Sequence, residues 1–122
     1  MPKLKKKKVL IPTEYEEAKV FCDWLNYNRY RFSHIQNEQS NSGNWGAIMK
    51  SKRLGVKPGV PDYIICGKNR SVLIFVELKR IKGFKLRKEQ TDWILAIKNT
   101  GNEASYCFGA EKAVEFVKSV DK

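Results

Sequence analysis

The chain has 122 residues, which is enough for one compact domain and too few for two cores. Hydrophobic residues make up 42% and charged residues 30%, a balance that excludes a disordered protein. Lysine and arginine number 24 against 13 acidic residues, so the formal net charge of +11 predicts a polyanionic partner. Nucleic acid is the first candidate and an acidic membrane surface the second. The chain shows no lipidation motif or basic amphipathic anchor helix, and its apolar runs are too short to span a bilayer, so we expect no membrane partner.

Residues 1–11 form a basic arm, and we expect a single domain over residues 12–122. No long apolar stretch follows the arm, so it does not resemble a secretory signal. It fits either a nuclear localisation patch or an arm that touches phosphates, and we favour the second. The three cysteines are widely spaced and form no CxxC pair, which argues against disulfides and zinc. A reducing cytoplasm is predicted, with each cysteine as a small core residue.

The first half of the chain begins with a predicted helix, which runs from an N-cap at Thr13 to about Asn26. Apolar residues fall on one face of this helix at helical spacing, so that face is expected to be core. Ala18, Phe21, Cys22 and Leu25 form that face. The following segments are a strand at 31–36, a loop at 39–45, a short basic helix at 47–54 and a rigid turn at 56–61.

The second half contains the two clearest strands, at 62–66 and 71–79, which a short turn joins into a hairpin. Residues 72–76 are apolar on both faces, which predicts a central strand covered on both sides. A helix at 86–100, a strand at Glu103–Phe108 and a helix at 111–120 follow. The order α-β-(short helix)-β-β-α-β-α indicates a mixed α/β sandwich.

Three residues on this hairpin have the chemistry of a hydrolytic site. Glu77 and Lys79 are two apart on a strand and therefore share a face. Asp62 lies opposite Glu77 if Gly67 faces Val72, and it is a diagonal neighbour on the same face if Cys66 faces Ser71. Two adjacent carboxylates repel each other, and a divalent cation such as Mg²⁺ or Mn²⁺ removes that repulsion. Phosphodiester hydrolysis uses such a cation together with a positive group, a role that Lys79 fits.

A Glu-x-Lys triplet at a strand end is common, and alone it usually marks a solvated edge. Pro61-Asp62 at hairpin distance, the buried strand before Glu77 and the net charge all favour a functional site. Together with further motifs, these residues resemble the VRR-NUC (virus-type replication-repair nuclease) family of the PD-(D/E)xK superfamily, in particular its small stand-alone phage-type members. The resemblance rests on Gly59-Val60-Pro61-Asp62, Phe75-Val76-Glu77-Leu78-Lys79-Arg80 and Glu89-Gln90, with Pro12-Thr13-Glu14, Asn37-Glu38 and Gly55-Val56-Lys57-Pro58-Gly59 in support.

The resemblance implies a restriction-endonuclease-like mixed sheet with an α-β-β-β-α-β core flanked by helices. It implies a Mg²⁺- or Mn²⁺-dependent DNA endonuclease that acts on branched DNA such as Holliday junctions, in replication, repair or recombination. Asp62 and Glu77 would be metal ligands, Lys79 the catalytic lysine and Gln90 a positioning group. Glu17 would complete the acidic cluster as a further catalytic residue and metal ligand, with Glu14 as the alternative. Glu14 also suits the first turn of a helix, near the positive end of its dipole.

The predicted DNA contacts are basic residues that surround the approach to the hairpin. They are Lys50, Lys52, Arg53, Lys57, Arg80, Arg87 and Lys88. Arg87 and Lys88 stand where the family often has Ser-Pro, so the start of this helix departs from the family pattern. His34, the only histidine, is interpreted as structural. Asn37-Glu38 fits either a turn or the active site, and Trp45 fits either a base-stacking contact or a loop anchor.

The rival class is a non-catalytic nucleic-acid-binding protein in which the acidic cluster is only structural. A sequence-specific restriction enzyme is a third reading, disfavoured by the lack of a recognition module. We expect a homodimer, because two cuts in a four-way junction need two symmetry-related sites. Aromatic residues could contribute to the interface or close the monomer's own core. These are Tyr27, Tyr30, Phe32 and Trp45.

Overall fold

The computed structural model describes residues 10–36, 44–82 and 85–122. Its elements follow the predicted order, and they are α1 (Glu14–Tyr27), β1 (Phe32–His34), α2 (Trp45–Arg53), β2 (Tyr63–Cys66), β3 (Leu73–Lys79), α3 (Lys88–Asn99), β4 (Glu103–Phe108) and α4 (Ala110–Val120). Most of the predicted basic arm, and the Asn37-Glu38 pair, lie outside the described residues.

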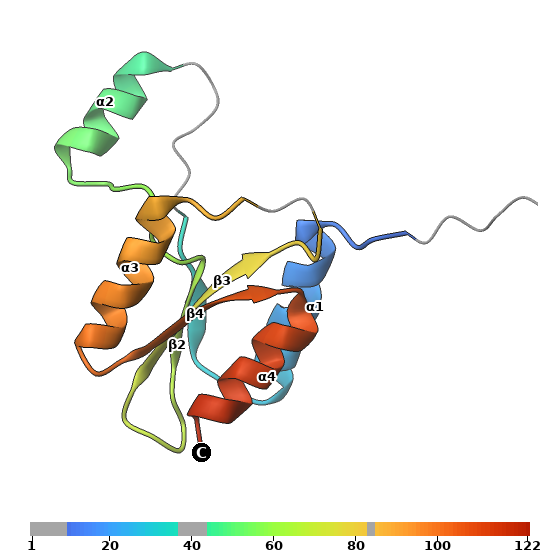
Figure 1. Cartoon of the computed structure of the whole chain (residues 1–122). Helices are drawn as coiled ribbons and strands as arrows, with labels where there is room; N and C mark the ends of the chain where they lie inside the picture. The colour runs from blue at the N-terminus through green and yellow to red at the C-terminus, as the bar shows by residue number, and fades with distance from the viewer. Residues whose placement is uncertain (1–9, 37–43, 83–84) are drawn as a thin grey trace, which may run out of the picture.

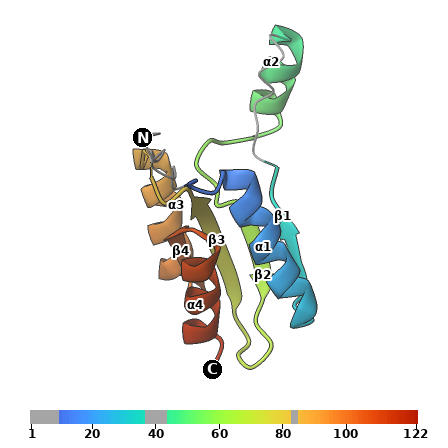
Figure 2. The same cartoon turned by 90° about the vertical axis from the view of Figure 1, so that its right-hand side faces the viewer.

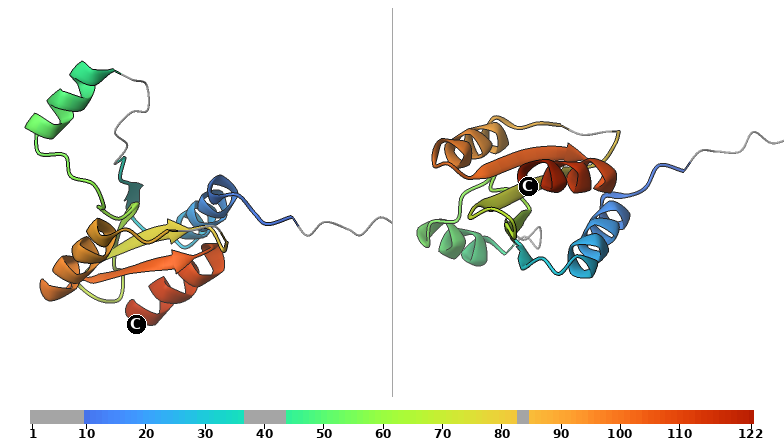
Figure 3. Two further views of the ribbon diagram at one scale, coloured as in Figure 1. Left: turned by 45° about the horizontal axis from the view of Figure 1, so that its top comes forward. Right: turned by 90° about the horizontal axis from the view of Figure 1, so that it is seen from below.

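The four strands form one mixed sheet in the order β1-β2-β3-β4. The pairs β1–β2 and β2–β3 are antiparallel, whereas β3 and β4 are parallel. Helices α1 and α4 cover one face of the sheet and α3 covers the other (Figures 1 and 3). The fold is therefore the predicted mixed α/β sheet flanked by helices. The apolar run on β3 is also confirmed as a central strand, because β2 and β4 lie on either side of it.

The hairpin adopts the first of the two predicted registers. Tyr63 pairs with Val76 and Cys66 pairs with Leu73. The backbone N–H of Gly67 donates to the carbonyl of Val72 over 2.9 Å, so these two residues face each other across the turn. Continued one step beyond β2, the same register brings Asp62 opposite the position of Glu77.

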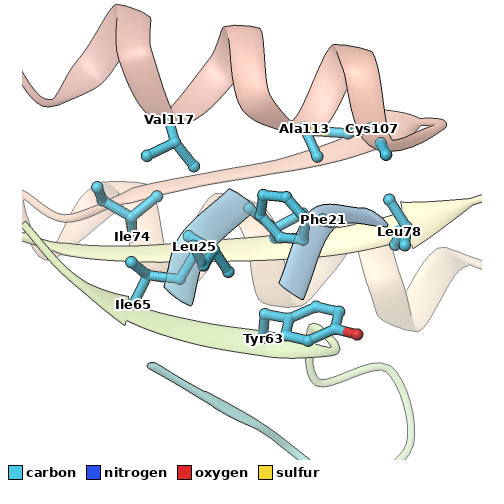
Figure 4. Packing of buried hydrophobic residues seen from close by; sticks show 11 residues of the cluster. Phe21, Leu25, Tyr63, Ile65, Ile74, Leu78, Cys107, Ala113 and Val117 are labelled. Atoms are coloured by element: carbon cyan, nitrogen blue, oxygen red, sulfur yellow. The ribbon is translucent and has the colours of Figure 1, made fainter. Parts of the chain in front are cut away.

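The hydrophobic core lies between the sheet and the pair α1 and α4 (Figure 4). Phe21 and Leu25 of α1 are fully buried, which confirms the predicted core face of this helix. Cys107 is buried in the same core, but Cys66 is exposed. The prediction that every cysteine is a core residue is therefore wrong for Cys66, the final residue of β2.

Local signals set the ends of several helices. The Thr13 side chain accepts from the Glu16 backbone N–H, which confirms the predicted N-cap. Helix α2 begins two residues earlier than predicted, because Asn44 caps it by accepting from the Ala47 backbone N–H. At α3 the side chain of Gln90 accepts from the backbone N–H of Arg87 over 3.2 Å. This contact is the half of a capping box that the third helical residue supplies, and the helix starts at Lys88.

Helix α2 stands apart from the rest of the described structure (Figures 1 and 2). None of its nine residues is buried against the other described residues. Two of the four aromatic residues considered for an interface pack inside the monomer. Tyr30 stacks on Trp24 with 5.6 Å between ring centroids, and Phe32 packs against the core. Tyr27 and Trp45 are 87% and 70% exposed. Within the described ranges no helix has the length and apolarity needed to cross a membrane.

Candidate active site

Asp62 directly precedes β2, and hydrogen bonds of its backbone and its side chain hold it beside the end of β3. The preceding Pro61 is fully buried, and the Asp62 carbonyl accepts from the Ile35 backbone N–H over 2.6 Å. The carboxylate oxygen Oδ2 accepts from the backbone N–H of Leu78 over 2.9 Å. Because Leu78 follows Glu77 directly, this bond fixes the Asp62 carboxylate beside the backbone that carries Glu77.

Glu77 is one of two charged residues that are buried among those described, with 4% of its surface exposed. Its oxygen Oε1 accepts from Nε2 of Gln90 over 3.0 Å, so α3 reaches across to the strand. Its oxygen Oε2 is buried and has no hydrogen-bond partner among the described residues. A buried carboxylate oxygen without a donor is costly, which makes this atom the least satisfied part of the site.

The surroundings of Glu77 disfavour its charged form. Burial, and then the close approach and negative charge of the Asp62 carboxylate, raise the pKa of Glu77 to about 8. The Lys79 ammonium opposes this shift in pKa, while the nearby Glu14 carboxylate adds to it. Two other carboxylates, those of Asp62 and Glu14, therefore act on Glu77.

Lys79 lies on the same face of β3 as Glu77, two residues further along the strand. Its Nζ is 3.9 Å from Oε1 of Glu77, and only 16% of its side chain is exposed. A cation held at this distance partly offsets the charge of the buried carboxylate. The structure thus brings Asp62, Glu77, Lys79 and Gln90 together, and each was expected from the sequence.

The structure does not bring Glu17 to this cluster. Its Oε2 instead accepts from the backbone N–H of Ala110, the first residue of α4. The residue before that helix is Gly109, which has no side chain for a cap. A side chain there would also collide with Glu17, since a Cβ on Gly109 would lie 2.7 Å from Oε2. The α1 carboxylate that lines the pocket with Asp62 and Glu77 is Glu14, the alternative that the sequence left open.

Glu14, Asp62, Glu77 and Gln90 line a pocket with a volume of about 640 Å³, whereas Lys79 and Glu17 are not among its lining residues. Lys57 and Arg87 also line it, whereas Lys50, Lys52 and Arg53 lie on the separate helix α2. Arg80 and Lys88 are exposed outside it, and Lys88 pairs with Asp92 at 3.7 Å.

Gly59 has a φ of +92°, and a Cβ there would lie 2.6 Å from the Glu89 carbonyl carbon. Glycine thus lets the loop before Asp62 pack closely against the first turn of α3.

Sequence reasoning missed two aromatic residues of this pocket. His34 was interpreted as structural, yet it is exposed and lines the pocket at the end of β1. Tyr15, next to Glu14, lines the pocket as well. The pairing of β1 with β2 was the missing information, because it sets His34 opposite Tyr63, the neighbour of Asp62.

The chemistry of the donor set fits a divalent cation. Among residues 10–36, 44–82 and 85–122, no three His, Cys, Asp or Glu side chains are already grouped as metal ligands. Asp62 and the unpartnered Oε2 of Glu77 nevertheless provide hard oxygen donors that repel each other, with Glu14 nearby. A cation such as Mg²⁺ or Mn²⁺ would satisfy that oxygen and remove the repulsion.

Two solved structures have a similar fold. One, described as "VRR_NUC domain protein", has a TM-score of 0.71 and 21% sequence identity, and the match covers 93% of this chain and 89% of that one. Another, described as "VRR_NUC domain", has a TM-score of 0.60 and 15% identity, with coverage of 88% and 96%. No family model and no curated protein matches the sequence. The similarity spans nearly the whole chain.

Proposed function

We propose that this chain, whose fold is that of VRR-NUC domains, is a metal-dependent DNA endonuclease of the VRR-NUC family. One observation carries the proposal, namely the buried Oε2 of Glu77, which has no partner among the described residues and lies beside Asp62. A structural carboxylate would be expected to have its hydrogen bonds satisfied. Unsatisfied buried carboxylates are instead typical of functional sites.

Each residue of the site has a distinct role in this proposal. Asp62 and Glu77 hold a Mg²⁺ or Mn²⁺ ion, with Glu14 as a further carboxylate in the same pocket. When bound, such an ion polarises a phosphate oxygen and makes a coordinated water more acidic. Gln90 keeps the Glu77 carboxylate in one orientation through its bond to Oε1. Lys79 places its ammonium group where negative charge develops during phosphodiester hydrolysis.

DNA is the substrate that the charge of the chain supports. The net charge is +11, and Lys57 and Arg87 lie in the same pocket as the carboxylates. Lys50, Lys52 and Arg53 extend this basic character onto α2, which carries no acidic residue in its first turn. Arg80 and Lys88 add exposed positive charge nearby. We propose that these residues contact phosphates, which supplies affinity that does not depend on base sequence.

Branched DNA and a homodimer complete the proposal. Each domain has one pocket with this carboxylate pair, so two symmetric cuts in a junction need two copies. The exposed rings of Tyr27 and Trp45 remain free to contribute to an interface or to DNA, whereas Tyr30 and Phe32 pack in the monomer. Sedimentation is expected to give about twice the chain mass of 14.1 kDa. Cleavage of a cruciform plasmid should give paired nicks. A monomer that makes single nicks would contradict the proposed dimer but not the nuclease function.

We propose that the protein acts in the cytoplasm, which is consistent with its three free cysteines.

The nuclease proposal is tested by nicking of supercoiled plasmid with and without Mg²⁺ or Mn²⁺. The wild-type protein should nick the plasmid only with the metal present. The Asp62→Asn variant should not nick it with or without metal. Asparagine keeps an acceptor for the Leu78 N–H, so this variant should fold. Asp23→Asn is the matched control, because Asp23 is exposed on α1 outside the pocket. Metal-independent nicking, or full activity in Asp62→Asn, would contradict the proposal. DNA binding without cleavage would indicate the non-catalytic alternative.

A further inference from the structure

Two aromatic residues that line the pocket, Tyr15 and His34, have no role in the mechanism above. Tyr15 lies in the first turn of α1 and is 78% exposed. His34 is the last residue of β1 and is exposed as well. Both line the same pocket as Asp62 and Glu77. A ring this exposed adds little to the stability of the core and is accessible to a ligand in the pocket.

The orientation of His34 is fixed by its neighbour on β2. His34 pairs with Tyr63, and the two ring centroids lie 5.1 Å apart at an interplanar angle of 67°. Tyr63 is itself 3% exposed and packs edge-on against Phe21 of α1. One side of the His34 ring is therefore held by the core, and its exposed part borders the pocket. Asp62 and Glu77 line this same pocket.

Other residues of the same pocket have the opposite chemistry. Lys57, in the loop before β2, and Arg87, at the start of α3, provide positive charge. The pocket thus combines aromatic rings from α1 and β1, cations from the loop and α3, and the carboxylates that would hold the metal. A nucleotide has the complementary parts, since its base is flat and aromatic and its phosphate is anionic.

The form of DNA that can use the aromatic rings is restricted. In a stacked duplex the bases present only their edges in the grooves, and their faces are covered by neighbouring bases. Only a base out of the stack can place its face on a protein ring. The volume of about 640 Å³ lies within the range of pockets that enclose small ligands, which suits a single nucleotide.

We propose that Tyr15 and His34 form a stacking subsite for the base of an unpaired nucleotide next to the scissile phosphate. The proposal rests on the nuclease function above and adds the form of DNA that the pocket recognises. Cutting is then favoured where at least one nucleotide beside the cut is unpaired, as at a branch point. The subsite tolerates different bases, because every base presents an aromatic face.

The test measures binding without cleavage, by fluorescence anisotropy in EDTA. The probes are labelled forked oligonucleotides with either a normal base or an abasic site at each unpaired position near the fork. Removal of one stacked base should weaken wild-type binding about tenfold at one position. Tyr15→Ala and His34→Ala should weaken binding of the normal probe by a similar factor. In these variants the abasic site should lower the affinity for the probe only slightly further, because the ring on which the base stacks has already been removed.

Three variants separate stacking from structural damage. Tyr15→Phe and His34→Phe keep a ring and should bind nearly as the wild type does. Val20→Ala is the matched control, since Val20 is an exposed apolar residue of the same helix α1, outside the pocket. Equal binding by Tyr15→Ala, His34→Ala and Val20→Ala would overturn the subsite. An abasic penalty that is unchanged in Tyr15→Ala and His34→Ala would also overturn it. Loss of binding in the two Phe variants would overturn stacking as its basis.

The two proposals fail in different ways. If the subsite is wrong and the nuclease function is right, plasmid is nicked with Mg²⁺ while Tyr15→Ala and His34→Ala bind forks as the wild type does. If the nuclease function is wrong, plasmid stays intact with either metal whatever the anisotropy shows. A wild-type protein that binds forked and fully paired DNA equally well would also overturn the subsite.

Discussion

Gln90 donates from Nε2 to Oε1 of Glu77 over 3.0 Å, and this bond leaves Oε2 of the same carboxylate buried without a donor among the described residues. The contact ties the first turn of α3 to the central strand of the sheet. It also fixes which carboxylate oxygen is left to meet a cation, because the other is already occupied. The consequences of this arrangement can be tested separately in stability and in activity.

Glu77→Gln should separate the two properties. The neutral amide removes a charge that burial and Asp62 disfavour, and it offers Asp62 a donor. Without metal the variant should be as stable as the wild type or more so, by up to about 1 kcal/mol. Cleavage should fall about a thousandfold, the scale of losing one strong electrostatic contact in the transition state. Urea unfolding in EDTA and plasmid nicking in Mg²⁺ measure the two effects.

DNA binding provides the control for this variant. Because the basic residues supply most of the affinity, Glu77→Gln and Lys79→Ala should bind DNA nearly as well as the wild type. Full cleavage activity in either variant would contradict the proposed site.

Glu14 and Glu17 should differ although they lie one turn apart on α1. Glu14→Gln should lower the affinity for Mg²⁺ and the cleavage rate, because Glu14 lines the pocket beside Glu77. Glu17→Gln should leave cleavage unchanged and destabilise the fold by about 1 kcal/mol, because its carboxylate caps α4. Isothermal titration with Mg²⁺ and thermal unfolding form the comparison. The reverse pattern, with metal affinity lost in Glu17→Gln, would show that Glu17 belongs to the metal site.

Asp121 should make stability depend on pH in the acidic range. Burial alone would raise the pKa of Asp121, but donors from the Tyr30 hydroxyl and three backbone N–H groups outweigh burial and lower it. These N–H groups belong to Lys68, Asn69 and Arg70 in the β2–β3 turn. A lowered pKa in the folded state means that the stabilisation is complete above the unfolded pKa of about 4. It is lost as the pH falls through the lower folded pKa.

Asp121→Asn tests this dependence. At pH 7 it should cost about 2 kcal/mol, because the amide replaces a charged acceptor of several hydrogen bonds. The difference from the wild type should shrink as the pH falls below about 4. Urea unfolding over the range from pH 2 to pH 7 measures it. Asp92→Asn is the control, since Asp92 is exposed and its ion pair with Lys88 contributes little. An equal difference at all pH values would contradict the assignment.

Helix α2 should contribute directly to the salt dependence of DNA binding. Changing Lys50, Lys52 and Arg53 together to Gln should weaken binding at low salt. It should also reduce the slope of log affinity against log salt concentration by about 3. The triple change of Lys98, Lys118 and Lys122 to Gln alters the net charge equally, on exposed residues at the other end of the fold. Equal effects of the two triple variants would show that only the overall charge matters.

The local pattern of the sequence was enough to predict much of the fold and the placement of Asp62, Glu77 and Lys79 on one hairpin. Side chains alternate along a strand, so Glu77 and Lys79 had to share a face of β3 in any register. The turn composition of 67–70 forced the strand of Asp62 to fold back on the strand of Glu77, and the structure has that hairpin. Thr13 likewise fixed the start of α1, because a cap bond spans only three residues.

Tertiary contacts decided the rest, because they join residues far apart in the chain. Glu14 and Glu17 lie in one helical turn and are chemically identical, so nothing local shows which of them faces the pocket. The choice depends on α4, whose first N–H lies within reach of Glu17 only because Gly109 leaves room. His34 became a pocket residue only through the pairing of β1 with β2. A sequence pattern specifies the face of an element, but which element covers that face is set by the packing of the whole chain.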